Sequence, residues 1–235
     1  MSVEEPVSTS LWARRVKRPF DLLASIALIA LASPFMLIIA GLIKTSPGPV
    51  FFRQIRSGRM GTEFWLIKFR TMRGDRRPDP KELVPLNHPE ITPVGRLLRR
   101  LKLDELPQLF NIAKGEMSLV GPRPTLPDQV AAYDVFQRRR VLVRPGLTGL
   151  AQVNSSAASP WDERILYDVY YVQRHGLTMD AGILLKTIPV ALLGERHFAR
   201  PFASSPFAAR CSEGWRTTQP PSRPETPSEE TQKSP

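Results

Sequence analysis

The longest hydrophobic pattern in the chain is an almost uninterrupted apolar run from Leu22 to Ile43. As an α-helix, a segment of this length reaches about 33 Å, and the hydrocarbon core of a bilayer is about 30 Å thick. The run therefore predicts a helix that enters a membrane. Ser33-Pro34 lies near its middle, and proline removes a backbone donor and clashes with the preceding turn. We therefore expect the helix to break or kink at Ser33-Pro34.

Three topologies compete for this run. A cleaved signal peptide would have a shorter apolar core and a small-residue cleavage site, and the sequence has neither. A straight transmembrane span fits the length. However, cations lie on both sides, namely Arg14, Arg15, Lys17 and Arg18 before the run and Lys44, Arg53, Arg56 and Arg59 after it. Because cytoplasmic flanks collect Lys and Arg, we favour a re-entrant hairpin with both ends on the cytoplasmic face, and the span is the alternative.

The rest of the hydrophobic pattern predicts a small α+β unit that is mostly helical. Apolar segments on either side of Ser57-Gly58 predict a β-hairpin within 50–72. Prolines and charges fill 74–93, which predicts a long irregular loop of the kind that often serves as a lid. Periodic apolar positions predict helices over 94–101, from Asp104 to about Gly115, over 129–141, over 161–175 and over 180–193.

The helix expected over 94–101 is amphipathic and basic. Val94, Leu97, Leu98 and Leu101 fall at i, i+3, i+4 and i+7, and arginines take most of the other positions. Such a helix suits the plane of an anionic membrane surface, so we expect it to lie at the interface. A surface helix packed on an ordinary core is the alternative.

These features divide the chain into four parts. Residues 1–13 are polar and unpatterned, and we expect a flexible terminus there. Residues 14–48 hold the basic flank and the re-entrant helix, and residues 49–199 hold the domain that would carry any catalysis. Residues 200–235 contain seven prolines among Ser, Thr and Glu, which predicts a disordered tail.

Charge narrows the kind of partner. The chain has 33 Lys and Arg against 22 Asp and Glu, a formal net charge of +11. Such a surplus implies a polyanionic partner: nucleic acid, anionic lipid headgroups or a phosphorylated substrate. The single cysteine, Cys211, excludes an intramolecular disulfide. None of the three histidines lies at a metal-ligand spacing, which argues against a zinc site or a Ser-His-Asp triad.

Asp104-Glu105 is the strongest candidate for chemistry. At a predicted helix N-terminus both carboxylates lie near free backbone donors and the positive end of the helix dipole. That environment keeps Asp104 ionised, as a nucleophile or a metal ligand must be. The structural alternative is that Asp104 only caps the helix, which is a frequent role of Asp at that position.

Basic residues around the pair favour a phosphate site. Arg99 precedes it, Arg123 follows in a proline-fixed turn, and Arg144 sits in a Pro-Gly turn. Guanidinium groups bind phosphate oxygens in a bidentate way, and carboxylates bind the hard cation Mg²⁺. Carboxylates also attack phosphorus to form an acyl phosphate. Asp168 is either a further metal ligand or the partner in a structural salt bridge.

Five strings in the chain carry a resemblance to a known family: KRPFDLLASIALIALASPFML, FRQIRSGRMGTEFWLIKFRTM, LKLDELPQLFNIAKGEMSLVGPRP, VRPGLTGLAQVN and YDVYYV. They resemble the bacterial sugar transferases, which are monotopic phosphoglycosyl transferases acting on polyprenol phosphate. The resemblance runs in order from about Lys17 to Leu193. The chain resembles the minimal form of the family, without the additional N-terminal helices and domain of larger members.

The resemblance implies a two-step reaction. Asp104 would attack the β-phosphorus of a UDP-sugar, releasing UMP and leaving a phosphosugar on the enzyme. Polyprenyl (undecaprenyl) phosphate would then attack this intermediate and begin the synthesis of a lipid-linked polysaccharide or other glycan. The implied Mg²⁺ ligands are Asp104, Glu105 and Asp168. The implied phosphate-binding residues are Arg99, Arg123 and Arg144, and the implied helix break is Ser33-Pro34.

The resemblance also implies a location and partners. The location is the bacterial inner (cytoplasmic) membrane, with the catalytic domain on the cytoplasmic face. The expected partners are a UDP-sugar, polyprenyl phosphate and membrane lipids, with no nucleic acid; a homodimer is left open.

One loop departs from the family pattern. Gly149–Ser156 reads GLAQVNSS where many members read GWAQVNGR, which leaves the choice of sugar open.

Two other classes of protein compete with the sugar transferase interpretation. A non-enzymatic basic membrane protein that binds nucleic acid or lipid would explain the charge but not the acids within the basic region. CDP-alcohol phosphatidyltransferases need several spans and a spaced set of aspartates, and this sequence has neither.

Overall fold

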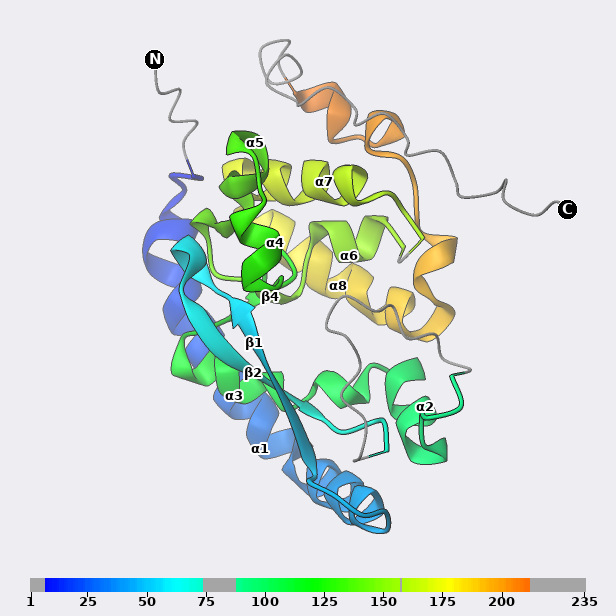
Figure 1. The fold of residues 1–235 in the computed structure, drawn as a ribbon. Coiled ribbons are helices and arrows are strands. Elements are labelled where there is room, and N and C mark those ends of the chain that lie inside the picture. The colour runs from blue at the N-terminus through cyan, green and yellow to red at the C-terminus, as the bar shows by residue number, and fades with distance from the viewer. Residues whose placement is uncertain (1–6, 74–87, 157, 212–235) are drawn as a thin grey trace, which may run out of the picture.

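The computed structural model describes residues 7–73, 88–156 and 158–211 (Figure 1). Over these residues the fold is α+β and mostly helical, as expected. The strands are β1 (Phe51–Ser57), β2 (Glu63–Phe69), β3 (Ser118–Val120) and β4 (Gly146–Thr148). The helices are α1 (Lys17–Lys44), α2 (Pro93–Arg100), α3 (Gln108–Lys114), α4 (Pro127–Ala131), α5 (Val135–Arg138), α6 (Leu150–Asn154), α7 (Trp161–Arg174) and α8 (Leu177–Leu193).

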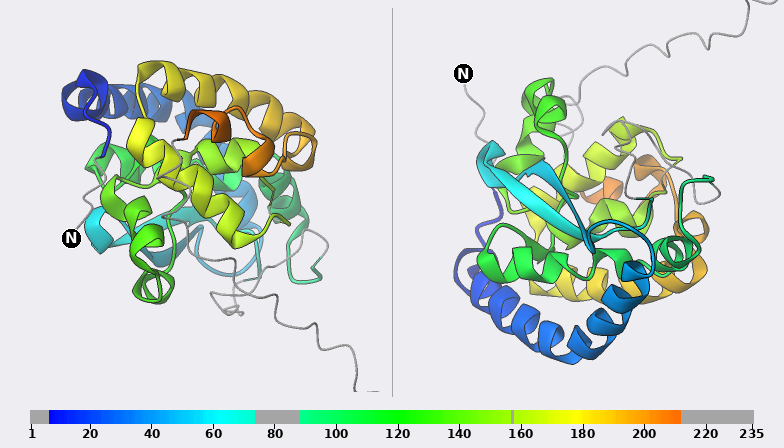
Figure 2. Two further views of the ribbon diagram at one scale, coloured as in Figure 1. Left: turned by 90° about the horizontal axis from the view of Figure 1, so that it is seen from above. Right: turned by 60° about the horizontal axis from the view of Figure 1, so that its bottom comes forward.

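The apolar run forms α1, which is one helix with Pro34 inside it. Together with a preceding π-helical turn, it makes up Trp12–Lys44, which is long and apolar enough to cross a membrane. The right-hand view of Figure 2 shows that α1 bends as it passes beneath the rest of the molecule. The helical backbone continues on both sides of Pro34, so the helix is not interrupted at Ser33-Pro34.

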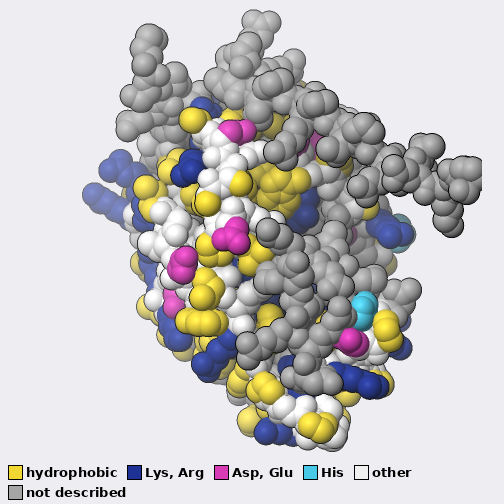
Figure 3. All heavy atoms as spheres, viewed as in Figure 1, with side chains coloured by type: hydrophobic (Ala, Val, Ile, Leu, Met, Phe, Trp, Pro, Cys, Tyr) yellow, Lys and Arg dark blue, Asp and Glu magenta, His cyan; other side chains and the backbone are white. Residues whose placement is uncertain are grey.

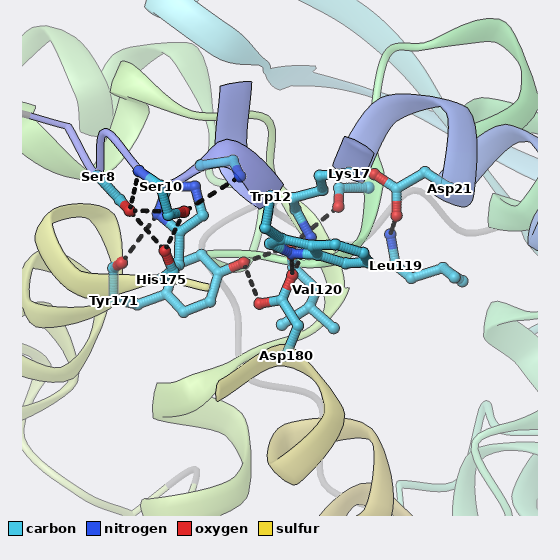
Figure 4. A network of polar contacts seen from close by, with 12 residues as sticks. Ser8, Ser10, Trp12, Lys17, Asp21, Leu119, Val120, Tyr171, His175 and Asp180 are labelled. Atoms are coloured by element: carbon cyan, nitrogen blue, oxygen red, sulfur yellow. Dashed lines mark hydrogen bonds and ion pairs between the residues drawn. The ribbon is translucent and has the colours of Figure 1, made fainter. Parts of the chain in front are cut away.

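The N-terminal end of α1 is tied to the folded domain by buried polar contacts (Figure 4). Lys17 Nζ lies 2.6 Å from Asp180 Oδ2 on α8, and Trp12 Nε1 donates to the same oxygen at 2.8 Å. The carboxylate of Asp21 accepts from the backbone N–H of Leu119 on β3 at 3.1 Å. This end of the helix is therefore anchored to two separate elements of the domain.

The C-terminal end of α1 contacts the same domain. Arg70, just after β2, donates to the backbone oxygens of Ile43 at 3.1 Å and Ser46 at 3.0 Å. Met36 and Ile39 are buried in a small apolar cluster that includes Phe69 and Leu98. The opposite face of α1 is apolar and exposed, with Leu31, Phe35 and Leu37 between 65% and 73% accessible. Figure 3 shows exposed apolar side chains beside Lys and Arg at the lower end of the molecule, where α1 ends.

The expected β-hairpin is confirmed. β1 and β2 pair antiparallel from Phe51 opposite Phe69 to Ser57 opposite Glu63. A second sheet, which the sequence did not predict, pairs β3 with β4 in parallel. It depends on glycine, because a Cβ at Gly146 would lie 2.1 Å from the backbone nitrogen of Gly121. The turn that carries Arg123 follows β3, and the turn that carries Arg144 leads into β4.

The helix expected over 129–141 is broken, and the single-helix prediction was wrong. It is replaced by α4, α5 and a 3-10 turn over Arg139–Leu142. Asp134 causes the break by capping α5, since its side chain accepts from the backbone N–H of Gln137. Among the other expected helices, α2 and α7 agree within a residue, and α8 begins three residues earlier than expected, at Leu177.

Both ends of the described chain are more ordered than the sequence indicated. Ser8 and Ser10 donate their hydroxyls to the backbone oxygen of His175, so the flexible segment expected over 1–13 does not extend through residues 8–13. At the other end, Phe202 is buried against α7, where its ring lies 5.0 Å from that of Tyr167. Disorder expected from residue 200 therefore does not hold for 200–211. The rest of that tail and most of the expected loop over 74–93 lie outside the described residues.

A candidate phosphate site around Asp104 and Glu105

Asp104 and Glu105 lie in a 3-10 turn, Leu103–Glu105, between α2 and α3. Both are 9% exposed. The preceding Lys102 has a left-handed backbone with φ of 58°, a conformation that costs a non-glycine residue free energy and often marks functional sites. α3 begins at Gln108, with Pro107 at its N-cap, and neither α3 nor the turn has a side-chain cap. The expected start of this helix at Asp104 was wrong, and Asp104 is not a helix cap.

Glu105 is held by two cations. Arg123 Nη2 donates to its Oε1 at 2.8 Å, and Lys68 Nζ lies 3.7 Å from the same oxygen. Burial acts to raise the pKa of Glu105, but the charges of Arg123 and Lys68 and the hydrogen bond from Arg123 outweigh it and lower the pKa to about 2. Glu105 is therefore a permanent anion at neutral pH.

Asp104 has the opposite electrostatic character. Burial raises its pKa, and the charge of the adjacent Glu105 raises it further, while Lys68, Arg99 and Lys102 act to lower it. A carboxylate with a raised pKa is more basic when ionised, which favours nucleophilic attack. The pKa values of the two adjacent acids are therefore shifted in opposite directions, lowered for Glu105 and raised for Asp104.

Two cations of this site, Arg56 and Lys68, were not among the expected site residues. They stand on β1 and β2, and burial lowers the pKa of Arg56 to about 10, with Arg123 as the second cause. The alternation of side chains along β2 could have predicted the position of Lys68. Side chains two residues apart share a face, so Lys68 lies on the same face of β2 as the buried Phe64 and Leu66.

Two of the three expected arginines, Arg99 and Arg123, lie at this site, and the third lies at the end of α3. Arg123 contacts Glu105. Arg99 donates to Thr71 Oγ1 at 2.9 Å, and the charge of Asp104 acts to raise the pKa of Arg99. Arg144 does not join them. Its Nε donates to the backbone oxygen of Gly115, the residue that ends α3, so it satisfies a carbonyl at the far end of that helix from Asp104.

Asp168 forms a salt bridge, the second of the two arrangements considered for it. It is 2% exposed and pairs with Arg140 at 2.6 Å. Arg140 in turn donates to the backbone oxygen of Arg123 at 3.1 Å. The Asp168–Arg140 pair therefore supports the turn that presents Arg123 to Glu105.

The described residues contain no group of three or more His, Cys, Asp or Glu side chains placed to share a metal ion. The adjacent carboxylates of Asp104 and Glu105 are the acidic groups of this site. Mg²⁺ is commonly held by one or two carboxylates together with substrate phosphates and water. The donor set therefore fits Mg²⁺ bound jointly with a phosphorylated substrate rather than by protein alone.

The loop that departs from the expected pattern is closed by its own hydrogen bonds. Asn154 accepts from Lys186 Nζ at 2.6 Å, and Ser155 donates to the backbone oxygen of Ala151 at 2.7 Å. The backbone N–H of Ser156 donates to Ser159 Oγ at 3.0 Å. All three residues are buried. Asn154 contacts α8 through Lys186, and Ser155 contacts α6 through Ala151.

Comparison with known families matches residues 12–194 to the family described as bacterial sugar transferase. The match covers well over half of the chain and includes every element of the site. This protein belongs to the bacterial sugar transferase family.

Three relatives show the range of the family. The chain is 43% identical over 181 residues to the uncharacterized sugar transferase EpsL of Bacillus subtilis, which covers 77% of this chain and 89% of the relative. It is 41% identical over 186 residues to the UDP-N-acetylgalactosamine-undecaprenyl-phosphate N-acetylgalactosaminephosphotransferase of Aeromonas hydrophila, covering 76% and 44%. It is 40% identical over 191 residues to the UDP-glucose:undecaprenyl-phosphate glucose-1-phosphate transferase of Caulobacter vibrioides, covering 75% and 69%. The chain thus spans most of the first relative and less than half of the second.

Proposed function

We propose that this protein transfers a sugar-1-phosphate from a UDP-sugar to undecaprenyl phosphate, releases UMP, and so starts the assembly of a lipid-linked polysaccharide. The observation that carries the proposal is the buried pair Asp104 and Glu105, surrounded by more cations than it neutralises. Family membership supports it, and two relatives are named for transfer of a sugar phosphate to undecaprenyl phosphate. Their sugars differ, so family membership leaves the sugar open.

In the first step an ionised oxygen of Asp104 bonds to the β-phosphorus of the donor. The bond from that phosphorus to the bridging oxygen breaks, and its electron pair leaves with UMP. Lys68 and Arg123 lie beside the pair and stabilise the negative charge of the diphosphate, since charge-assisted contacts in a partly buried site are strong. Glu105 keeps Arg123 in place for this contact.

In the second step a phosphate oxygen of the lipid acceptor attacks the phosphosugar held on Asp104. The bond between Asp104 and phosphorus breaks, the carboxylate is restored, and the lipid carries a diphospho-sugar. The two steps use the same phosphorus and the same surrounding cations. One site therefore serves both the donor and the acceptor.

Asp104 and Glu105 are the residues that would hold Mg²⁺ in this reaction. When bound, the ion would neutralise charge on the diphosphate oxygens and favour departure of UMP. Asp168 is excluded from the proposed ligand set because it is paired with Arg140.

A re-entrant arrangement of α1 on the cytoplasmic side forms part of the proposal. Both ends of α1 contact one polar domain, through Lys17 and Asp180 at one end and Arg70 and Ile43 at the other. A straight span would carry the two ends to opposite sides of the bilayer, so the domain could hold both only by entering the hydrocarbon. The bend of α1 and the cations on both flanks support a helix that dips into one leaflet and returns. Enzyme and lipid acceptor then share one interface.

The test is an assay of UMP release by the purified full-length protein with Mg²⁺, undecaprenyl phosphate and a panel of UDP-sugars. We expect UMP with at least one sugar, together with a labelled lipid product. Asp104→Asn removes the nucleophile and should abolish release. Asp134→Asn, which alters an exposed helix cap, is the matched control. Failure to release UMP with every sugar tested would overturn the proposal.

A further inference from the structure

Trp161, the first residue of α7, contacts two arginines. The guanidinium carbon of Arg140 lies 4.9 Å from the centroid of its ring, and that of Arg164 lies 5.4 Å from it. Both distances are within the range of a cation–π interaction. One aromatic ring therefore holds two like charges close together.

Only one of the two arginines is neutralised. Arg140 is paired with Asp168 at 2.6 Å and also donates to the hydroxyl of Tyr133. Across the described residues, the guanidinium of Arg164 has neither an ion pair nor a hydrogen bond, and the Trp161 ring is its contact. Arg164 is half-buried and has no anionic partner among the described residues, so its guanidinium is available to an external anion.

Arg164 belongs to the surroundings of the phosphate site. Burial lowers its pKa; Asp168 and Glu195 act to raise it, and Arg123 and Arg140 act to lower it. Its connection to the reactive acids is also structural. Trp161 contacts Arg140, Arg140 donates to the backbone oxygen of Arg123, and Arg123 contacts Glu105.

The charges decide what Arg164 can bind. Glu105 and Asp168 neutralise two of the three guanidinium groups of Arg123, Arg140 and Arg164, and Arg164 is the one left over. Lys68 and Arg123 lie directly beside the reactive pair, where the phosphorus that Asp104 attacks would sit. Arg164 is joined to them through the Trp161 ring, which it shares with Arg140, and Arg140 donates to the backbone of Arg123. A donor with two linked phosphates would extend from one to the other.

We infer that Arg164, held over Trp161, binds the phosphate of the donor that leaves with the nucleoside. This rests on the proposed function. When Asp104 bonds to the outer phosphorus, the bridging oxygen keeps the electron pair and the departing nucleoside monophosphate gains negative charge. Arg164 stabilises that charge without touching the phosphorus that is transferred. The ligand class is thus a nucleoside diphosphate as donor and a nucleoside monophosphate as product.

The experiment compares Arg164→Gln with Arg164→Lys and with Arg174→Gln, an exposed arginine at the other end of α7. Equilibrium binding of UMP and of uridine is measured for each full-length protein, beside KM for the UDP-sugar and inhibition by UMP. Loss of one hydrogen bond to a charged group predicts about 10- to 100-fold weaker binding of UMP in Arg164→Gln. Uridine, which has no phosphate, should bind all variants equally. The Lys variant should recover part of the loss, and Arg174→Gln should match wild type.

The outcomes separate this inference from the proposed function. If wild type turns over a UDP-sugar and Arg164→Gln keeps the wild-type UMP affinity and KM, the inference is overturned and the proposed function stands. If uridine and UMP affinities fall together, or the variant melts at a lower temperature than wild type, the residue is structural and the inference is also overturned. If wild type neither turns over any UDP-sugar nor binds UMP, both fail.

Discussion

At the scale of single residues, the site separates two adjacent carboxylates by their surroundings. Glu105 is bound by Arg123 and Lys68, and its pKa is lowered to about 2. The pKa of Asp104 is raised by burial and by the charge of Glu105. Neighbouring acids with opposite shifts can take different roles in one reaction. We assign nucleophilic attack to Asp104 for this reason.

This assignment predicts the pH dependence of the first half-reaction. As the pH falls through the raised pKa of Asp104, the nucleophile is protonated, and kcat/KM should fall about tenfold per pH unit below it. Glu105 stays ionised until about pH 2, so one acidic limb is expected rather than two. In Glu105→Gln the neighbouring negative charge is gone, and the limb should move to lower pH. A pH–rate profile of UMP release checks this, and an unmoved limb in that variant would contradict the assignment.

Asp168 permits a second test at this scale, since a metal ligand and a salt-bridge partner behave differently. Asp168→Asn leaves the charge of Arg140 buried without its partner, which should destabilise the fold by about 3–5 kcal/mol. Urea unfolding measures the loss, and Asp162→Asn, exposed on the same helix, is the control. Unchanged stability with a higher Mg²⁺ requirement would instead make Asp168 a metal ligand.

At the scale of elements, the parts predicted from sequence are those with a long local period. The alternation through β1 and β2 and the helical period of α7 need no distant partner, and both were correct. The break between α4 and α5 was missed although its signal is local, because Asp134 with Gln137 forms a capping box. β3 and β4 could not be predicted. Each has three residues, and their pairing joins segments far apart in the chain.

The same division applies to the site. The structure brings Asp104, Glu105, Arg99 and Arg123 together, and three of these four lie in one short segment of the chain. The structure does not bring Arg144 to them, because a Pro-Gly turn fixes the backbone but not the element that its side chain will contact, here the end of α3. Asp168 on α7 pairs with Arg140, which lies in a separate 3-10 turn 28 residues earlier in the chain. No local pattern specifies such a contact.

Gly146 provides a prediction at the scale of elements. A Cβ there would lie 2.1 Å from the nitrogen of Gly121, so Gly146→Ala should separate β4 from β3 and displace the turn that carries Arg123. We expect a loss of about 1–3 kcal/mol or more in stability and a large loss of UMP release. Gly182→Ala on α8 is the control, because nothing lies within 4 Å of its added Cβ. Thermal melting and the UMP assay measure both; wild-type values in Gly146→Ala would contradict this role for the β3–β4 sheet.

At the scale of the whole molecule, α1 is connected to the elements that carry the site. Asp21 on α1 bonds to Leu119 on β3, the strand that leads into the turn carrying Arg123. α1 therefore also supports the segment that carries Arg123, the arginine for which we propose phosphate binding. Its two ends are held by the same domain, which is the basis for the proposed re-entrant topology.

Cysteine labelling tests that topology. Single cysteines at the exposed positions Arg14 and Lys44, in a background with Cys211→Ala, mark the two ends of the apolar helix. A membrane-impermeant maleimide should label neither position in intact cells and both in inverted membrane vesicles. Labelling of the two positions from opposite sides would establish a straight span and overturn the re-entrant proposal.

Covalent catalysis by Asp104 is tested most directly by the mass of the protein after incubation with a UDP-sugar and Mg²⁺ in the absence of lipid acceptor. We expect release of UMP and an adduct of one sugar phosphate on Asp104, which disappears when undecaprenyl phosphate is added. Asp104→Asn should form no adduct, and Asp134→Asn should form it normally. Product formation with UMP released only when the acceptor is present, and with no adduct at any time, would show that Asp104 is not a covalent nucleophile.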